Sequence, residues 1–282
     1  MKSAAFDYVR PGTLEQALQI LSERTEGARV LAGGQSLAPA LNLRLAAPEL
    51  LVDIGGLAQF RYIEEGANAL RIGALTRHVD VERSEIVARR CPLLSRAIAH
   101  VAHPAIRNRG TLGGSLAQAD PAAELPACML ALDAVIHAAG PGGERRIAAR
   151  DFFQGVFETA LRPGEVLTGV EIGGLGPDRT YGFAELSRRR GDFAIVGLAL
   201  AARRSSTALS DVRLAFFGVA DRPVLARAAA SALGAGDMSA ARAALATDLK
   251  PVSDAQASSA MRLHLAGVLL ERAFNETLEA SA

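Results

Sequence analysis

Hydrophobic positions in the first part of the chain follow both the helical and the extended period. Those between residues 14 and 21 recur at i, i+3, i+4 and i+7, so they share one helical face. Thr13 and Gln16 stand at capping-box spacing before that face. Short apolar runs predict strands at 6–9, 29–32 and 50–54. A short helix is expected at 37–45, so the first unit reads as a small mixed domain.

The middle of the chain again mixes the two periods. Two short runs around a turn predict a hairpin, with strands at 62–64 and 70–72. Pro92 opens a helix with one apolar face, and a second helix is expected at 124–132. Strands are predicted at 134–138 and 145–148. Between the two helices, residues 103–121 are rich in turn formers, so we expect a turn-rich segment there.

Turn formers cluster at 173–177, and this cluster is the best domain boundary. Beyond it, alternating patterns predict an antiparallel sheet with three strands, at 181–186, 194–201 and 212–219. Alanine-rich helices are expected at 224–233, 239–246 and 254–278. The chain is therefore predicted to be α+β, with a first domain at 1–175, divided into about 1–56 and 57–175, and a second at 178–282.

Composition narrows the class of protein. The 282 residues fit about two domains, and 31 Lys and Arg against 30 Asp and Glu give a net charge of +1. A balanced charge argues against nucleic acid as the main partner. The most apolar stretch, 193–202, is shorter than the roughly 20 residues that a membrane span needs. No secretory pattern opens the chain, so we expect a cytoplasmic protein without an integral membrane segment.

The titratable side chains suggest no catalytic or metal centre. Cys91 and Cys128 are the only cysteines, and an iron–sulfur cluster needs about four cysteine ligands. The five histidines show no metal-ligand spacing. We therefore assign no catalytic residue and no metal ligand to this chain.

The first candidate site is a glycine pair after a predicted strand. Gly33 and Gly34 lie between Ala32 and the polar residues Gln35 and Ser36. Consecutive glycines let backbone N–H groups turn toward one point, and a following helix N-terminus favours phosphate. The competing interpretation is a tight turn with a serine cap.

The second candidate site repeats these features, with Gly113 and Gly114 between Thr111, Leu112 and Ser115. Asp120 follows, and it could accept hydrogen bonds from sugar hydroxyls or cap a helix before Pro121. Neither glycine pair lies in a Rossmann fingerprint, and the chain has no Walker A loop. Two such loops suit one large diphosphate ligand held along its length.

These motifs together resemble the medium, FAD-binding subunit of the xanthine dehydrogenase and aerobic carbon monoxide dehydrogenase family. The resemblance covers nearly the whole chain and rests on the order of the segments at 32–37, 52–54, 72–76, 111–116, 119–121 and 189–194. It implies a two-part FAD-binding domain like that of vanillyl-alcohol oxidase, followed by a C-terminal domain of the carbon monoxide dehydrogenase flavoprotein type.

The resemblance also implies the cofactor-binding residues. Residues 32–36, with Leu37 beside them, and residues 111–115 would hold the FAD diphosphate and ribityl chain through N–H groups and hydroxyls. Asp120 would bond hydroxyls or ring atoms. Leu167 would be an apolar wall, and Phe193 stands where relatives often carry Tyr or Trp near the flavin. For Leu167 and Phe193, burial in the core is the competing interpretation.

The family places the hard chemistry on cofactors. It implies a large partner subunit with a molybdenum cofactor and a small partner with two [2Fe–2S] clusters, assembled as a dimer of heterotrimers. This chain would take electrons from those clusters and pass them to an external acceptor. The alternative is a free-standing FAD-dependent oxidase or reductase of the same superfamily, with its own substrate pocket.

Overall fold

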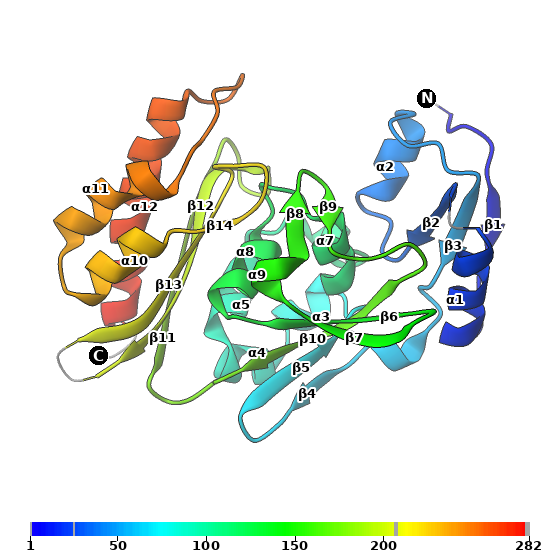
Figure 1. The fold of residues 1–282 in the computed structure, drawn as a ribbon, viewed down its shortest axis with the longest axis horizontal. Helices are drawn as coiled ribbons and strands as arrows, with labels where there is room; N and C mark the ends of the chain where they lie inside the picture. Colours follow the sequence, from blue (N-terminus) through cyan, green and yellow to red (C-terminus); the bar gives the residue numbers. More distant parts are fainter. Residues whose placement is uncertain (1, 25, 206–207, 280–282) are drawn as a thin grey trace.

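The described residues form four β-sheets, and the three larger ones follow one another along the molecule in chain order (Figure 1). The computed structural model describes residues 2–24, 26–205 and 208–279. The N-terminal sheet lies at one end, a five-stranded sheet and its helices form the centre, and a four-stranded sheet with three helices lies at the other end. The predicted α+β class is confirmed.

The N-terminal sheet has three parallel strands in the order β1-β3-β2. They are β1 (Asp7–Val9), β2 (Ala28–Leu31) and β3 (Leu50–Asp53). Between them lie α1 (Leu14–Glu23) and α2 (Leu37–Asn42). Thr13 caps α1 by accepting from the N–H of Gln16 at 3.2 Å, while the Gln16 side chain accepts from the N–H of Gly12 at 2.9 Å. The predicted capping pair is therefore present, although the glutamine reaches one residue further back than in a capping box.

The central sheet is antiparallel where its pairing is described, in the order β4-β5-β10-β6-β7. Its strands are β4 (Ile63–Glu65), β5 (Ala69–Gly73), β6 (Val135–Gly140), β7 (Gly143–Ala148) and β10 (Val166–Gly173). The predicted hairpin is confirmed as β4 and β5. A small hairpin, β8 (Phe153–Gly155) and β9 (Glu158–Thr159), lies beside it.

Short helices accompany the central sheet. They are η1 (Ala58–Phe60), α3 (His78–Glu82), α4 (Glu85–Arg90), α5 (Pro92–Ile98), α6 (Pro104–Arg107), α7 (Leu112–Gln118), α8 (Glu124–Ala131) and α9 (Ala149–Phe152). The turn-rich segment predicted at 103–121 contains turns, and it also contains two short helices that the prediction did not include, α6 and α7. Pro104 at the first turn of α6 and the Thr111 cap of α7 supply the local start signals.

The C-terminal sheet is antiparallel and has one strand more than predicted. Its strands are β11 (Arg179–Ser187), β12 (Ala194–Arg204), β13 (Leu209–Phe217) and β14 (Val224–Leu225). Its helices are α10 (Arg227–Gly234), α11 (Met238–Asp248) and α12 (Ser259–Glu279). The helix predicted from residue 224 begins at Arg227, because a strand of two residues is too short to show a period. No helix in the described part of the chain is long and apolar enough to cross a membrane.

The two faces of the C-terminal sheet lie in different hydrophobic cores. Leu198 and Leu200 of β12 pack with residues of α10, α11 and α12. Ala199 and Ala201, which point to the opposite face, belong to the core of the central part of the chain. Helices α5 and α8 contact this second face. The sheet therefore joins the C-terminal helices to the rest of the molecule through one continuous wall.

Gly182 tests this packing, because a Cβ there would overlap the backbone carbonyl oxygen of Ala273 in α12. We expect Gly182→Ala to lower the free energy of unfolding by roughly 1–3 kcal/mol, since backbone on backbone cannot give way easily. Gly142→Ala is the matched control, because nothing lies within 4 Å of its Cβ position. Urea unfolding of both variants measures the difference, and equal stabilities would contradict the packing of β11 on α12.

Candidate functional site

The two glycine pairs, far apart in the sequence, lie against each other in the structure. A Cβ on Gly33 would overlap the carbonyl oxygen of Arg109 and would come within 2.9 Å of the Gly110 Cα. A Cβ on Gly114 would lie 4.0 Å from the Cβ of Ala32. The two candidate sites of the sequence are therefore parts of one site.

The first glycine pair offers free backbone donors. Gly34 has φ +73°, a left-handed conformation that glycine adopts without strain. Among the described residues, no group accepts a hydrogen bond from the N–H of Gly33, Gly34 or Gln35. Ser36 precedes α2, and its side chain makes no capping hydrogen bond. Three N–H groups and a hydroxyl are thus available to a ligand at this turn.

The second glycine pair has a different role, because it forms the first turn of α7. The N–H groups of Leu112 and Gly113 donate to the carbonyl oxygens of Thr76 and Ala74, at 2.9 and 2.8 Å. The N–H of Gly114 donates to Oγ1 of Thr111 at 3.1 Å. A Cβ on Gly113 would come within 2.6 Å of the Ala74 Cβ. These N–H groups are already used inside the chain, so this glycine pair serves close packing.

A cavity of about 310 Å³ opens where the two segments meet. Ala32, Gly33 and Thr111 line it together with Asp53. Four arginines also line it: Arg10, Arg61, Arg77 and Arg109. Four guanidinium groups against one carboxylate make the cavity positive, and arginine is well suited to binding phosphate.

Only one of these arginines lies close to either of the two candidate glycine pairs in the sequence. Arg109 stands beside the second glycine pair, whereas Arg10, Arg61 and Arg77 come from separate segments and share no spacing with it. No local signal could have found them. Arg107, the other arginine beside the pair, instead forms an ion pair with Glu82 at 3.0 Å.

The remaining sequence candidates lie outside this cavity. Leu37 begins α2 and is half-buried, and Leu167 is 4% exposed in the central core, so packing accounts for its apolar character. Phe193 is 64% exposed, so its core-burial interpretation is wrong. Asp120 accepts from the N–H of Ala122 at 2.9 Å, while α8 is capped by Ala123, so the helix-cap interpretation of Asp120 is also wrong.

Sequence reasoning missed two buried carboxyl groups between α8 and the C-terminal sheet. Glu185 continues the row of Tyr181 and Phe183 on the inward face of β11, and its side chain is 1% exposed. Glu124 begins α8 and is 9% exposed. Burial, and then the neighbouring carboxyl group, raise the pKa of Glu185 to about 8. Burial raises the pKa of Glu124 to about 7, with Asp120 adding to the shift.

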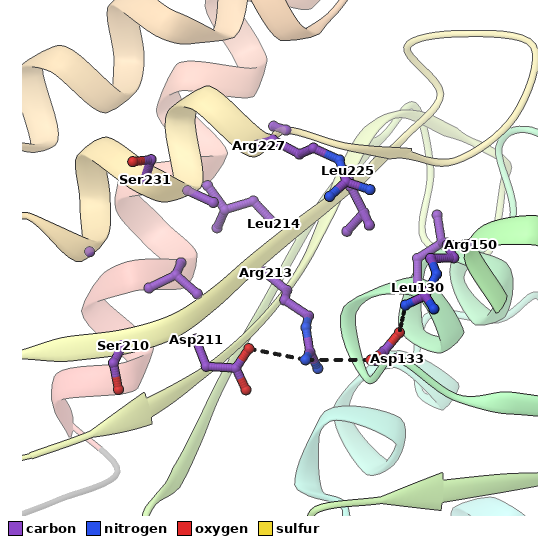
Figure 2. A pocket seen from close by; sticks show the side chains of 14 residues that line it. Leu130, Asp133, Arg150, Ser210, Asp211, Arg213, Leu214, Leu225, Arg227 and Ser231 are labelled. Carbon is purple, nitrogen blue, oxygen red and sulfur yellow. Dashed lines mark hydrogen bonds and ion pairs between the residues drawn. The ribbon is translucent and has the colours of Figure 1, made fainter. Parts of the chain in front are cut away.

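A larger cavity, about 670 Å³, lies between α8, β13 and α10 (Figure 2). Its wall contains an ionic chain in which Arg213 bonds Asp211 at 3.0 Å and Asp133 at 3.5 Å. Arg150 also pairs with Asp133, at 3.2 Å. This cavity shares no lining residue with the arginine-lined cavity. It therefore offers no substrate pocket beside the glycine pairs.

Comparison with known proteins places this geometry in a family. Residues 4–173 match the FAD binding domain in molybdopterin dehydrogenase, and residues 181–277 match the CO dehydrogenase flavoprotein C-terminal domain. The chain therefore belongs to the flavoprotein subunits of the molybdenum hydroxylases, and it is an oxidoreductase subunit with an FAD-binding domain.

Individual relatives agree over the whole length. The chain is 38% identical to the 6-hydroxypseudooxynicotine dehydrogenase complex subunit alpha of Paenarthrobacter nicotinovorans, covering 99% of this chain and 96% of that one. A solved carbon monoxide dehydrogenase from Hydrogenophaga pseudoflava superposes with a TM-score of 0.96 at 33% identity, covering 99% of both chains. Quinoline 2-oxidoreductase from Pseudomonas putida 86 superposes with a TM-score of 0.93 at 36% identity, again covering 99% of both.

The buried carboxyl groups predict a pH dependence of stability. The pKa values of Glu185 and Glu124 in the folded chain, about 8 and about 7, lie above the value of about 4.3 expected when unfolded. The folded chain therefore holds more protons between pH 5 and 8 (approximate limits set by these values), and stability falls as the pH rises through that window. Urea unfolding at several pH values measures this.

Glu185→Gln should flatten that fall, because an amide stays neutral. Glu144→Gln, at an exposed position of β7, is the control and should keep the wild-type slope. An unchanged pH dependence in Glu185→Gln would show that the Glu185 carboxyl group is not protonated in the folded chain.

Proposed function

We propose that this chain binds FAD across the two glycine pairs and serves as the electron-transfer subunit of a molybdenum hydroxylase. The observation that carries the proposal is the contact of Gly33 with the backbone of Arg109 and Gly110 beside a cavity lined by four arginines. The chain thereby presents free N–H groups and guanidinium groups to one point, as a diphosphate requires.

The residues present fit this cofactor. The N–H groups of Gly33, Gly34 and Gln35 would donate to phosphate oxygens, and Ser36 with Ala32 and Leu37 would complete that side of the site. From the other side, Thr111, Leu112, Gly113, Gly114 and Ser115 would form the wall, with hydroxyl groups at both ends. Arginines at the cavity would neutralise the diphosphate charge.

The other sequence candidates would act beyond the diphosphate. Asp120 follows α7 and would accept hydrogen bonds from hydroxyls or ring nitrogen atoms. Phe193 exposes an aromatic face that would pack on the flavin, whereas Leu167 would support the site from the core. FAD supplies two-electron chemistry that can be loaded in single-electron steps, and the chain itself needs no catalytic residue for it.

The partners of this chain follow from its relatives. We propose a large subunit with the molybdenum cofactor and a small subunit with two [2Fe–2S] clusters, assembled as a dimer of heterotrimers in the cytoplasm. An assembly of several subunits is supported by relatives that are called complex subunit alpha and medium subunit. The two cysteines, Cys91 and Cys128, are both buried, so an electron relay must come from another chain.

Within this proposal, residues 1–175 bind FAD and residues 178–282 contribute Phe193 and a docking surface. The substrate belongs to the large subunit, since the relatives' names include carbon monoxide, quinoline and nicotine derivatives. A free-standing oxidase is less well supported, because the large cavity is separate from the glycine pairs.

Gly33→Ala tests the site. Its Cβ would overlap the Arg109 carbonyl oxygen and separate the two segments, so we expect the FAD occupancy of the purified complex to fall from nearly full to about 10% or less, which needs binding weaker by roughly a hundredfold, about 2.7 kcal/mol. Flavin absorbance released on denaturation measures the content. Gly142→Ala, on an open turn, should retain full FAD.

A second variant tests the positive charge of the cavity without changing the packing of the two segments. Arg77→Gln removes one exposed guanidinium of the cavity without adding volume, so FAD binding should weaken several-fold and become less sensitive to salt. Arg188→Gln removes an equally exposed arginine from outside the cavity and is its control. Full FAD content in both Gly33→Ala and Arg77→Gln would place the cofactor elsewhere.

Co-expression with the partner subunits separates the two functional hypotheses. The chain should co-purify with an iron–sulfur protein and a molybdenum protein, and its flavin should be reduced by substrate only in the assembled complex. Turnover of an organic substrate by this chain alone would support the oxidase instead.

A further inference from the structure

Glu185 is a carboxyl group at a position that the fold reserves for apolar side chains. Tyr181 and Phe183 precede it on the same face of β11, and both belong to the central core. Its Oε2 atom is fully buried and has no hydrogen-bond partner among the described residues. Burial of an unpaired carboxylate is strongly unfavourable, so this position favours the protonated form of the group.

His100 connects this carboxyl group to solvent. Its Nδ1 lies 3.8 Å from Oε2 of Glu185, and the imidazole side chain is 44% exposed whereas the Glu185 side chain is 1% exposed. The ring also packs on Phe183, with centroids 5.1 Å apart. Imidazole can take a proton on one nitrogen while releasing one from the other. The 3.8 Å separation of Nδ1 and Oε2 is longer than a direct hydrogen bond, so a proton would pass between the two groups through one bridging water.

The other groups around the pair are also defined. Glu124 of α8 interacts with Glu185, and Asp120 interacts with Glu124. The thiol of Cys128 on α8 lies near enough to interact electrostatically with both glutamates and with the thiol of Cys91. Near His100 lie Arg190 of the following turn and Glu276 of α12, which also binds Arg96 at 3.3 Å. Burial and then Arg190 lower the pKa of His100, which favours its neutral form, while Glu276 acts in the opposite direction.

This cluster is joined at both ends to segments of the proposed flavin site. Asp120 and Glu124 directly follow α7, which begins at the second glycine pair. Glu185 ends the buried part of β11 just before the turn that carries Phe193. In that turn, Gly191 (φ +86°) would place a Cβ 2.7 Å from the Ala102 carbonyl oxygen, so the turn packs on the segment after α5. In the chain, Asp120 and Glu124 therefore follow one segment of the proposed flavin site, and Glu185 precedes the other.

We propose that His100, Glu185 and Glu124 form a proton relay that supplies the flavin site of this subunit from solvent. The inference rests on the proposed function. Reduction of FAD to FADH₂ consumes two electrons and two protons. The electrons come from the iron–sulfur clusters of the partner. A carboxyl O–H bond of the cluster breaks as a proton leaves toward the flavin, and the carboxylate regains a proton through His100.

The relay predicts that reduction of the flavin and protonation of Glu185 are coupled, because negative charge gained by the reduced flavin would raise the pKa of a carboxyl group that delivers protons to it. In the assembled complex, the midpoint potential of FAD should change its slope against pH near pH 8, where Glu185 loses its proton. A dithionite titration followed at the flavin band measures this potential. In Glu185→Gln that change of slope should disappear, while the exposed control Glu144→Gln should keep it.

His100→Gln tests proton transfer from solvent to Glu185, rather than protonation of Glu185 itself. It leaves both glutamates in place, so the curve of potential against pH should be retained, but the rate of flavin reduction by the partner should fall by about tenfold or more. Wild-type slope in Glu185→Gln, or a wild-type rate in His100→Gln, would overturn the relay.

A complex without FAD would overturn the proposed function itself, whereas a complex with FAD but without the change of slope overturns only the relay. Protonation of the Glu185 carboxyl group can also be tested on the full chain alone. Infrared spectra at pH 7 should contain the C=O band of protonated carboxylic acids, and this band should weaken in Glu185→Gln; its absence from the wild type, or an unchanged band in the variant, would overturn the relay.

Discussion

The close approach of Gly33 to the backbone of Arg109 and Gly110 is the contact on which the candidate site depends. It joins the turn after β2 to the segment before α7, and no side chain at residue 33 could replace it. The N–H of His78 holds the same segment from behind by donating to the Gly110 carbonyl oxygen at 2.9 Å. With both segments fixed, the arginines around them converge on one cavity.

The sequence was sufficient for most elements and for one half of the site. Strong periods, such as the apolar face of α1 and the hairpin of β4 and β5, appear where they were expected because local pattern and tertiary packing agree there. The turn at Gly33 and Gly34 also has the free N–H groups that its residues suggest. The arginines of the cavity were out of reach, because Arg10, Arg61 and Arg77 meet only through the topology.

Where prediction failed, a tertiary contact outweighed the local signal. Two glycines in a row disfavour a helix, yet Gly113 and Gly114 begin α7, because the helix must pack directly on Ala74. A glutamate in an alternating strand pattern, as at Glu185, ordinarily indicates a solvent-facing position. In this sheet, however, a hydrophobic core covers each face. A strand buried on both faces leaves no solvent side for a carboxylate. The burial of Glu185 therefore depends on tertiary packing and could not be predicted from the local sequence.

The structure thus separates two ways of handling charge. At the arginine-lined cavity the guanidinium groups are exposed and permanently charged, which suits a ligand whose own charge is permanent. Between α8 and β11 the carboxyl groups are buried, and their raised pKa values, about 7 for Glu124 and about 8 for Glu185, favour protonation near neutral pH most strongly at Glu185. A diphosphate needs the first arrangement, and a flavin that exchanges protons with its electrons needs the second. Helix α7 leads from Thr111 at the cavity toward Asp120, which interacts with Glu124, so this helix joins the two regions.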